Sequence, residues 1–232
     1  YVLDHWQDLN SSNDTLIEYF SINDDTYASK VQRDGNGLPV MEAPVFPTGS
    51  QSTFEFGSTF EFSGMGTSNK RVDSISQGFY VPANYIGPAN VNYTVRFYEW
   101  NDGNGNQSID DISELTLVAI GADTLVGVLS GVGTYIMQST QLIDVNTMMN
   151  GYAMQDNKTY VATVSLIASE NGQATFDASS MVWVACASSV NYAMNFFYTN
   201  EKPSFLHLID GGGAESLIDQ GFGFSRIPAM GL

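Results

Sequence analysis

The sequence is a succession of short apolar or alternating runs, each closed by a cluster of Gly, Asn, Asp and Ser. Runs rich in Val, Ile, Thr, Tyr and Phe are typical of β-strands, and the clusters supply the backbone conformations of turns. No long stretch has helical spacing, and only residues 146–154 allow a short helical turn. The pattern predicts an all-β, antiparallel β-sandwich that is jelly-roll-like with little helix. The expected strands are residues 16–22, 53–62, 75–81, 91–100, 115–121, 124–129, 135–142, 160–168, 181–187, 194–199 and 205–209.

The chain has 232 residues and no Pro-rich linker that would divide it. All-β sandwiches often reach this length as one unit, and a chain this long buries roughly 70–75% of its unfolded surface. We therefore expect a single domain over residues 1–232, with the polar residues 1–45 as an irregular lead-in. The chain starts at Tyr1 rather than at Met, so we expect it to be part of a longer precursor.

The charge balance is strongly acidic, with 8 Lys and Arg against 25 Asp and Glu and a formal net charge of −17. Such a surface repels nucleic-acid phosphates and anionic membranes, and no basic stripe offsets it. The sequence also lacks the run of roughly 18 apolar residues that spans a membrane. The single cysteine, Cys186, lies in an apolar run and is expected to be a small buried hydrophobe.

Two expected strands divide their side chains between two faces. In residues 53–62, one continuous strand places every Phe on one face and both Glu on the other, whereas a hairpin turning at Gly57 would mix them. In residues 91–100, the odd positions form an apolar core face. The even positions carry Arg96, Tyr98 and Trp100, which form either a second buried face or an aromatic platform for a sugar.

The most distinctive motif is the polar segment 101–114, which follows the strand expected at residues 91–100. Side-chain oxygens recur there at alternate positions, with Gly between them to let the chain curl. Calcium takes about six to eight oxygen ligands, and carboxylates this close repel one another unless a cation lies among them. Ile109 is expected to point inward and fix the loop to the core. The predicted calcium ligands are Asp102, Asn104, Asn106, Ser108 through its carbonyl, Asp110, Asp111 and Glu114.

This segment resembles an EF-hand loop, in which ligands alternate along the chain and a Glu completes the shell. It departs from that pattern because Gln107 stands where Gly is expected and Glu114 comes one position late. It also follows a strand rather than a helix, so we expect a calcium loop between β-strands. Residues 23–25 and 34–37 are weaker acidic turns, which are either a second ion site or plain loops.

Residues 97–102 and 113–116, which flank the loop, resemble modules of secreted proteins from Bacteroidota. Residues 221–228 resemble the closing strand before the type IX sorting region that such proteins often carry. The resemblance implies export to the extracellular space or the cell surface and implies no activity. Three Asp-Ser/Thr-aliphatic triplets fit the O-glycosylation pattern of that phylum, at residues 14–16, 73–75 and 123–125.

The sequence contains no catalytic motif: it lacks a nucleophile elbow, a phosphate-binding Gly loop and paired histidines at metal-ligand spacing. His207 is expected to face outward from a strand or to be hydrogen-bonded, and no carboxylate pair stands out for glycoside hydrolysis. We therefore expect a non-enzymatic, calcium-stabilised structural or adhesive module of a secreted or cell-surface protein or fibre. Its expected partners are other extracellular modules or copies of itself. A carbohydrate-binding module, with glycans as partners, is the alternative, and a secreted hydrolase ranks third.

Overall fold

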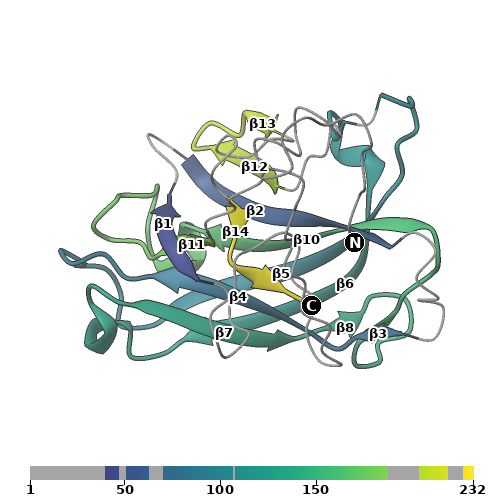
Figure 1. Cartoon of the computed structure of the whole chain (residues 1–232). Helices are drawn as coiled ribbons and strands as arrows, with labels where there is room; N and C mark the ends of the chain where they lie inside the picture. Colours follow the sequence, from purple (N-terminus) through teal and green to yellow (C-terminus); the bar gives the residue numbers. More distant parts are fainter. Residues whose placement is uncertain (1–39, 47–50, 63–69, 107, 188–203, 219–226) are drawn as a thin grey trace, which may run out of the picture.

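The computed structural model describes residues 40–46, 51–62, 70–106, 108–187, 204–218 and 227–232. Most of them belong to two large antiparallel sheets that enclose one apolar core, with a two-stranded ribbon beside them (Figure 1). This arrangement confirms the prediction of an all-β sandwich. Part of the expected irregular lead-in, residues 41–45, is instead a strand that pairs with residues 184–187.

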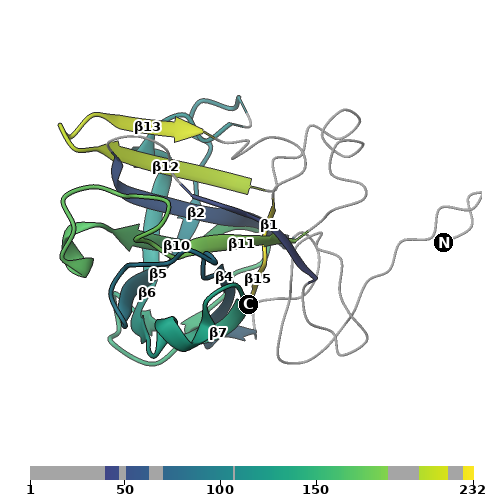
Figure 2. The same ribbon diagram turned by 90° about the vertical axis from the view of Figure 1, so that its left-hand side faces the viewer.

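The larger sheet consists of β2 Gln51–Phe62, β5 Val91–Trp100, β6 Leu115–Leu125, β8 Ile143–Asp144, β10 Lys158–Ile167, β12 Ser204–Asp210 and β13 Glu215–Ile218. Their order in space is β13-β12-β2-β10-β5-β6-β8. Figure 2 shows β13, β12 and β2 running side by side at one edge of this sheet. The long strands β2, β10 and β5 form its centre.

The smaller sheet consists of β1 Met41–Val45, β4 Ser74–Tyr80, β7 Tyr135–Gln141, β11 Trp183–Ala187, β14 Ile227–Pro228 and β15 Met230–Gly231. β4 pairs with β7 over its whole length and with β11 and β15 along its other edge. The ribbon is β3 Arg71–Val72 with β9 Tyr152–Ala153. The described residues also form three short 3-10 turns, η2 Ile112–Glu114, η3 Val128–Gly131 and η4 Ser169–Asn171.

The core is built from alternate residues of the central strands, as the sequence pattern predicts. In β5 the odd positions, Val91 to Phe97, are at most 1% exposed. In β2 the three described Phe side chains, Phe54, Phe56 and Phe60, are also at most 1% exposed. β2 pairs with β10 without interruption from Thr53 to Phe62, which confirms one continuous strand rather than a hairpin. Cys186 is buried in the same core, as expected.

Gly57 lies at the centre of the larger sheet, between Thr163 of β10 and Phe205 of β12. A Cβ atom at this position would lie 2.1 Å from the carbonyl oxygen of Ala162 and 2.7 Å from Cγ2 of Thr163. No side chain larger than hydrogen fits there without movement of the neighbouring backbone. The Gly that breaks the Phe-Glu alternation of the sequence is therefore needed for close strand packing.

Most expected strands within the described residues are confirmed, and one expected division between strands is wrong. The runs expected at residues 115–121 and 124–129 form a single strand, β6, up to Leu125, because Asp123 keeps its pairing with Tyr93 of β5. The Asp123 carboxylate accepts hydrogen bonds from the Thr124 N–H and from Nε2 of Gln138 in the other sheet. The short helical turn that the sequence allows near residues 146–154 is limited to a single turn, in which the N–H of Met148 donates to the carbonyl of Asp144 at 2.9 Å, and β9 follows. The strands expected at residues 16–22 and 194–199 lie outside the described residues.

Candidate functional site

The predicted ion loop, residues 101–114, connects β5 to β6. The N–H of Asn101 donates to the carbonyl of Glu114 at 2.8 Å, which ties the two ends of the loop together. Gly105 has a φ of 71°, a left-handed conformation that turns the chain back on itself. The loop therefore closes the end of a β-hairpin, as the sequence predicts.

Four of the predicted ligands are joined to one another by hydrogen bonds. The N–H of Asn106 donates to Oδ1 of Asp102 at 3.1 Å and to Oδ1 of Asn104 at 3.0 Å. The Asn106 side-chain amide donates to Oδ2 of Asp110 at 2.8 Å, and the Asn104 amide donates to Oδ1 of Asp110 at 3.2 Å. Asp110 is thus the centre of the cluster, and a bound cation requires both amides to turn their oxygens inward.

The other three predicted ligands lie in different places. The N–H of Asp110 donates to Oε2 of Glu114 at 3.4 Å, and Glu114 is buried beneath the cluster. Asp111 instead caps η2 by accepting from the N–H of Ser113 at 2.8 Å, which lowers the pKa of Asp111. Ser108 donates its N–H to Oδ1 of Asn106. The geometry therefore favours Glu114 over Asp111 as the carboxylate that completes the cluster.

Ile109 fixes the loop to the outer face of the larger sheet, the face turned away from the main core. Its side chain is 3% exposed and packs in a second apolar cluster. That cluster comprises Tyr98, Ile109, Leu115, Val161 and Phe205, with Trp100, Ile112, Leu117 and Leu217 at its margin. The inward direction predicted for Ile109 is correct, although it points to this second cluster rather than to the main core.

The cluster of the loop offers three carboxylates and two carboxamides, which are hard oxygen donors of the kind that calcium prefers. Among the described residues, no three His, Cys, Asp or Glu side chains gather closely enough to hold a metal ion by themselves. The candidate site depends on the two Asn as well as on the acids. This composition fits calcium better than zinc, which prefers His and Cys.

The aromatic platform considered for residues 98 and 100 is mostly buried. Tyr98 is 8% exposed and belongs to the second apolar cluster, and Trp100 packs against that cluster. Of the two readings of this face, the structure supports a second buried face. The aromatic rings that suggested a sugar platform are therefore packed against other side chains rather than displayed on the surface.

The same outer face holds a buried charge network that the sequence patterns do not predict. The carboxylate of Glu55, on β2, is 2% exposed. Its Oε1 accepts from Tyr98 OH at 2.9 Å and from Thr163 Oγ1 at 2.5 Å. Its Oε2 lies 3.4 Å from Nη1 of Arg96 and 3.2 Å from Nδ1 of His207. Each carboxylate oxygen therefore has two polar partners.

The network extends from Glu55 to the edge of the sheet through His207 of β12. The other ring nitrogen of His207, Nε2, lies 2.6 Å from Oε1 of Glu215 on β13. Burial raises the pKa of Glu55, but the His207 hydrogen bond and the Arg96 charge outweigh it and hold the pKa below its ordinary value. Burial lowers the pKa of His207, but its two carboxylate partners outweigh it and raise the pKa above its ordinary value. His207 thus lies between two carboxylates that favour its protonated form.

Sequence alternation correctly places Glu55 and Arg96 on the face opposite the main core, and of the two expectations for His207 the structure shows the hydrogen-bonded one. Alternation does not reveal that the three residues meet, because β2, β5 and β12 are far apart in the chain and their order in the sheet is set by tertiary structure. The available signal is that each is a charged or titratable residue flanked by apolar residues within a strand. Three such residues on one face predict a buried network only when the strand order is known.

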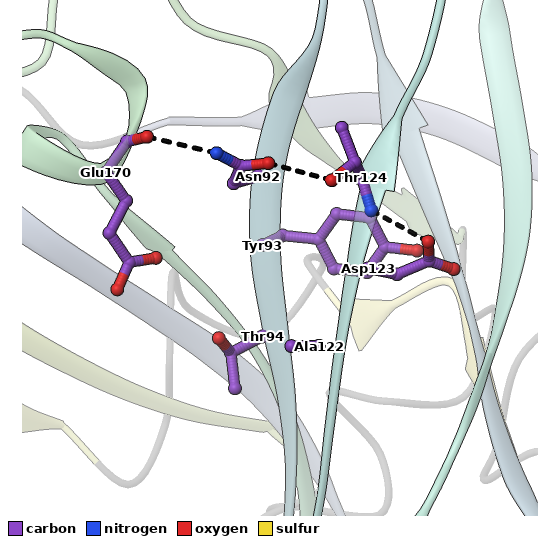
Figure 3. Close-up of a pocket in the computed structure, with 7 residues that line it drawn as sticks. All are labelled: Asn92, Tyr93, Thr94, Ala122, Asp123, Thr124 and Glu170. Carbon is purple, nitrogen blue, oxygen red and sulfur yellow. Dashed lines mark hydrogen bonds between the residues drawn. The ribbon is translucent and has the colours of Figure 1, made fainter.

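A pocket of about 440 Å³ lies over β5 and β6 (Figure 3). Its polar groups are engaged with one another: Asn92 Nδ2 donates to the carbonyl of Glu170 at 3.1 Å, and Thr124 Oγ1 donates to Oδ1 of Asn92 at 2.7 Å. These contacts stabilise the sheet surface and give no reason to assign a ligand. The lining residues are Asn92, Tyr93, Thr94, Ala122, Asp123, Thr124 and Glu170.

Two segments at the end of the sandwich opposite the ion loop contain no charged residue and carry exposed aliphatic side chains, with the exposed acids Glu170 and Asp177 nearby. The segments, residues 82–90 and 126–134, meet there, because Val128 N donates to the carbonyl of Ala89 at 2.9 Å. The exposed side chains include Ile86 at 78%, Val126 at 76% and Leu129 at 52%. We call these two segments the uncharged end.

No protein-family model matches the chain, and no curated protein matches it. The resemblance to secreted modules of Bacteroidota therefore stays a prediction. Within the described residues, no helix is long and apolar enough to cross a membrane. The class defined so far is an acidic all-β sandwich with a candidate ion loop at one end.

Proposed function

We propose that this protein is a calcium-stabilised structural module of a secreted or cell-surface protein. The observation that carries the proposal is the loop 101–114, in which oxygen-bearing side chains converge while Ile109 anchors the loop. A cation at this position would be held by the Asn oxygens and by carboxylates of Asp102, Asp110 and Glu114, and would offset their negative charge at the end of a hairpin. The benefit is stability of the β5–β6 connection, so the proposed role of the ion is structural.

The proposal sets the expected affinity. Asp102, Asp110 and Glu114 supply the negative charge, while two of the ligands are neutral Asn. Extracellular modules of this kind bind calcium at roughly 10⁻⁴–10⁻³ M. At a calcium concentration 100 times the dissociation constant, mass action adds about 2.7 kcal/mol to the free energy of unfolding. Magnesium keeps its water shell more firmly and should have a much smaller effect.

Calorimetric titration and thermal melting with calcium or magnesium test the proposal. The native chain should melt at a higher temperature with calcium, and Asp102→Ala should lose most of that rise. Asp111→Asn is the matched control, because Asn keeps the cap of η2 while the charge of the outward carboxylate is lost. It should keep the calcium response. Absence of calcium binding up to roughly 10⁻² M would show that the loop is only a turn.

We further propose that the module associates with copies of itself through the uncharged end. The net charge of −17 makes two copies repel each other over most of their surface. The uncharged end exposes aliphatic side chains and contributes no charge of its own to this repulsion, so apolar contact with a second copy is favoured there. Self-association would give the module a structural or adhesive role within a larger extracellular assembly.

Sedimentation velocity over a range of protein concentrations tests this association. The native chain should form dimers or larger species that persist or grow at high salt, since salt screens the repulsion and leaves apolar contacts in place. Ile86→Asp with Val126→Asp should be monomeric, whereas Met148→Asp with Met149→Asp, at exposed positions outside this end, should associate like the native chain. A native chain that remains monomeric at roughly millimolar concentration contradicts self-association.

A further inference from the structure

We propose that His207 is a proton-dependent clamp that holds the edge strand β13 on the larger sheet. The inference is independent of calcium and of self-association. It rests on the position of one imidazole ring between two carboxylates that belong to different strands. The ring bridges β2, through Glu55, and β13, through Glu215.

Apart from its ladder with β12 and the packing of Leu217 against the second apolar cluster, β13 has few described contacts that hold it on the sheet. The strand has four residues, and three of them are exposed. Within the described part of the chain it pairs with β12 alone, along its inner edge. The contact of Glu215 with His207 adds a side-chain link from β13 to β12. His207 transmits this link to Glu55 in the buried centre of the sheet.

The groups around His207 favour the protonated ring. Glu55 faces it from β2 and Glu215 from β13. Arg96 of β5 is the nearby positive charge, but it lies against the same Oε2 of Glu55 and so faces an anion rather than the ring. Tyr98 of β5 and Thr163 of β10 donate to the other oxygen of Glu55. A protonated His207 donates to both carboxylates at once.

A neutral imidazole has one N–H and one lone pair, so it can donate to only one of the two carboxylates. Glu55 is buried and cannot turn to water, whereas the Glu215 side chain is 46% exposed and can. Loss of the proton therefore leaves the N–H directed to Glu55 and a lone pair against Glu215. Glu215 should then move to solvent, and β13 should separate from β12 more often. The core of the sheet should stay closed.

Hydrogen exchange measured by NMR at several pH values tests the clamp in the whole chain. The protection factors of the β13 amides, corrected for intrinsic exchange, should fall about ten-fold or more as the pH rises through the titration of His207. Amides of β5 and β10 should keep their protection over the same range. The imidazole of His207 should itself titrate above pH 6.5, its ordinary value.

Three variants separate the clamp from other causes. His207→Gln and Glu215→Gln should both abolish the pH step at β13 while the core amides stay protected. His5→Gln removes the other histidine of the chain and should leave the step intact, and it also assigns the two imidazole signals. If β13 protection does not depend on pH, or if the step survives in His207→Gln, the clamp does not exist. Titration of His207 at or below pH 6.5 would also overturn it.

Discussion

The hydroxyl of Tyr98 donates a 2.9 Å hydrogen bond to Oε1 of the buried Glu55. The ring of Tyr98 packs in the same apolar cluster as Ile109, the anchor of the ion loop. One side chain therefore touches both features that distinguish the outer face of this sheet. It connects the loop at the end of β5 with the charge network that reaches β13.

Tyr98→Phe should destabilise the fold by about 1–3 kcal/mol, because a buried carboxylate loses a donor while the ring stays in place. Urea unfolding measures the loss. Tyr135→Phe is the control, since Tyr135 is 36% exposed. Loss of its hydroxyl group should change the free energy of unfolding by less than about 0.5 kcal/mol. Equal stability of the two variants would show that the Tyr98 hydroxyl does not support Glu55.

Ile109→Ala should cost about 2–5 kcal/mol, because it leaves a cavity in the second apolar cluster. It should also make the loop 101–114 more sensitive to proteolysis, since the anchor is lost. Ile143→Ala, at a position 39% exposed, removes the same atoms from the surface and should cost much less. If both changes have the same effect, Ile109 does not anchor the loop.

Local sequence patterns predicted the strands well because alternation and turn chemistry act over a few residues. The bounds expected for β5 match the structure, and β2 is the single strand that its Phe-Glu alternation requires. The break expected between residues 121 and 124 is absent, and the Asp123 carboxylate accepts from Gln138 of the other sheet, a contact that no local pattern reveals.

The ion loop and the Glu55 network also differ in how far a local sequence pattern could predict them. Ion-loop residues such as Asp102, Asn106 and Asp110 lie within nine positions of the sequence, and spacing alone brought them into one hypothesis. The Glu55 network joins residues up to 160 positions apart, from Glu55 to Glu215. Their meeting depends on the order β13-β12-β2-β10-β5 in the sheet. Strand order is set by the packing of the whole chain, so the sequence could not predict it.

Gly57→Ala should destabilise the protein by about 1–3 kcal/mol, because the added methyl group overlaps the backbone of β10. Thermal unfolding of the variant measures the effect. Gly103→Ala is the matched control, since a Cβ at Gly103 meets no atom within 4 Å. An equally stable Gly57→Ala variant would mean that β2 and β10 are less closely packed than described.

The charge network also predicts how stability depends on pH. The folded pKa of Glu55 lies below 4.5, so its contribution is complete above pH 4.5 and is lost as the pH falls through the folded value. The folded pKa of His207 lies above 6.5, so its contribution is complete below pH 6.5 and is lost as the pH rises through the folded value. Both contributions are therefore complete together between pH 4.5 and 6.5.

Glu55→Gln should flatten the acid side of this profile. The free energy of unfolding of the native chain should fall below pH 4.5, because Glu55 takes up a proton in the unfolded chain while it stays ionised in the folded chain. One such proton contributes a slope of at most about 1.4 kcal/mol per pH unit, and Gln contributes none. Urea midpoints from pH 6 to pH 3 give the slope for each chain. Glu170→Gln, which removes an exposed carboxylate outside the network, should keep the native slope. If Glu55→Gln loses stability toward acid as steeply as the native chain, the proton uptake belongs to other carboxylates and Glu55 is not held ionised by its partners.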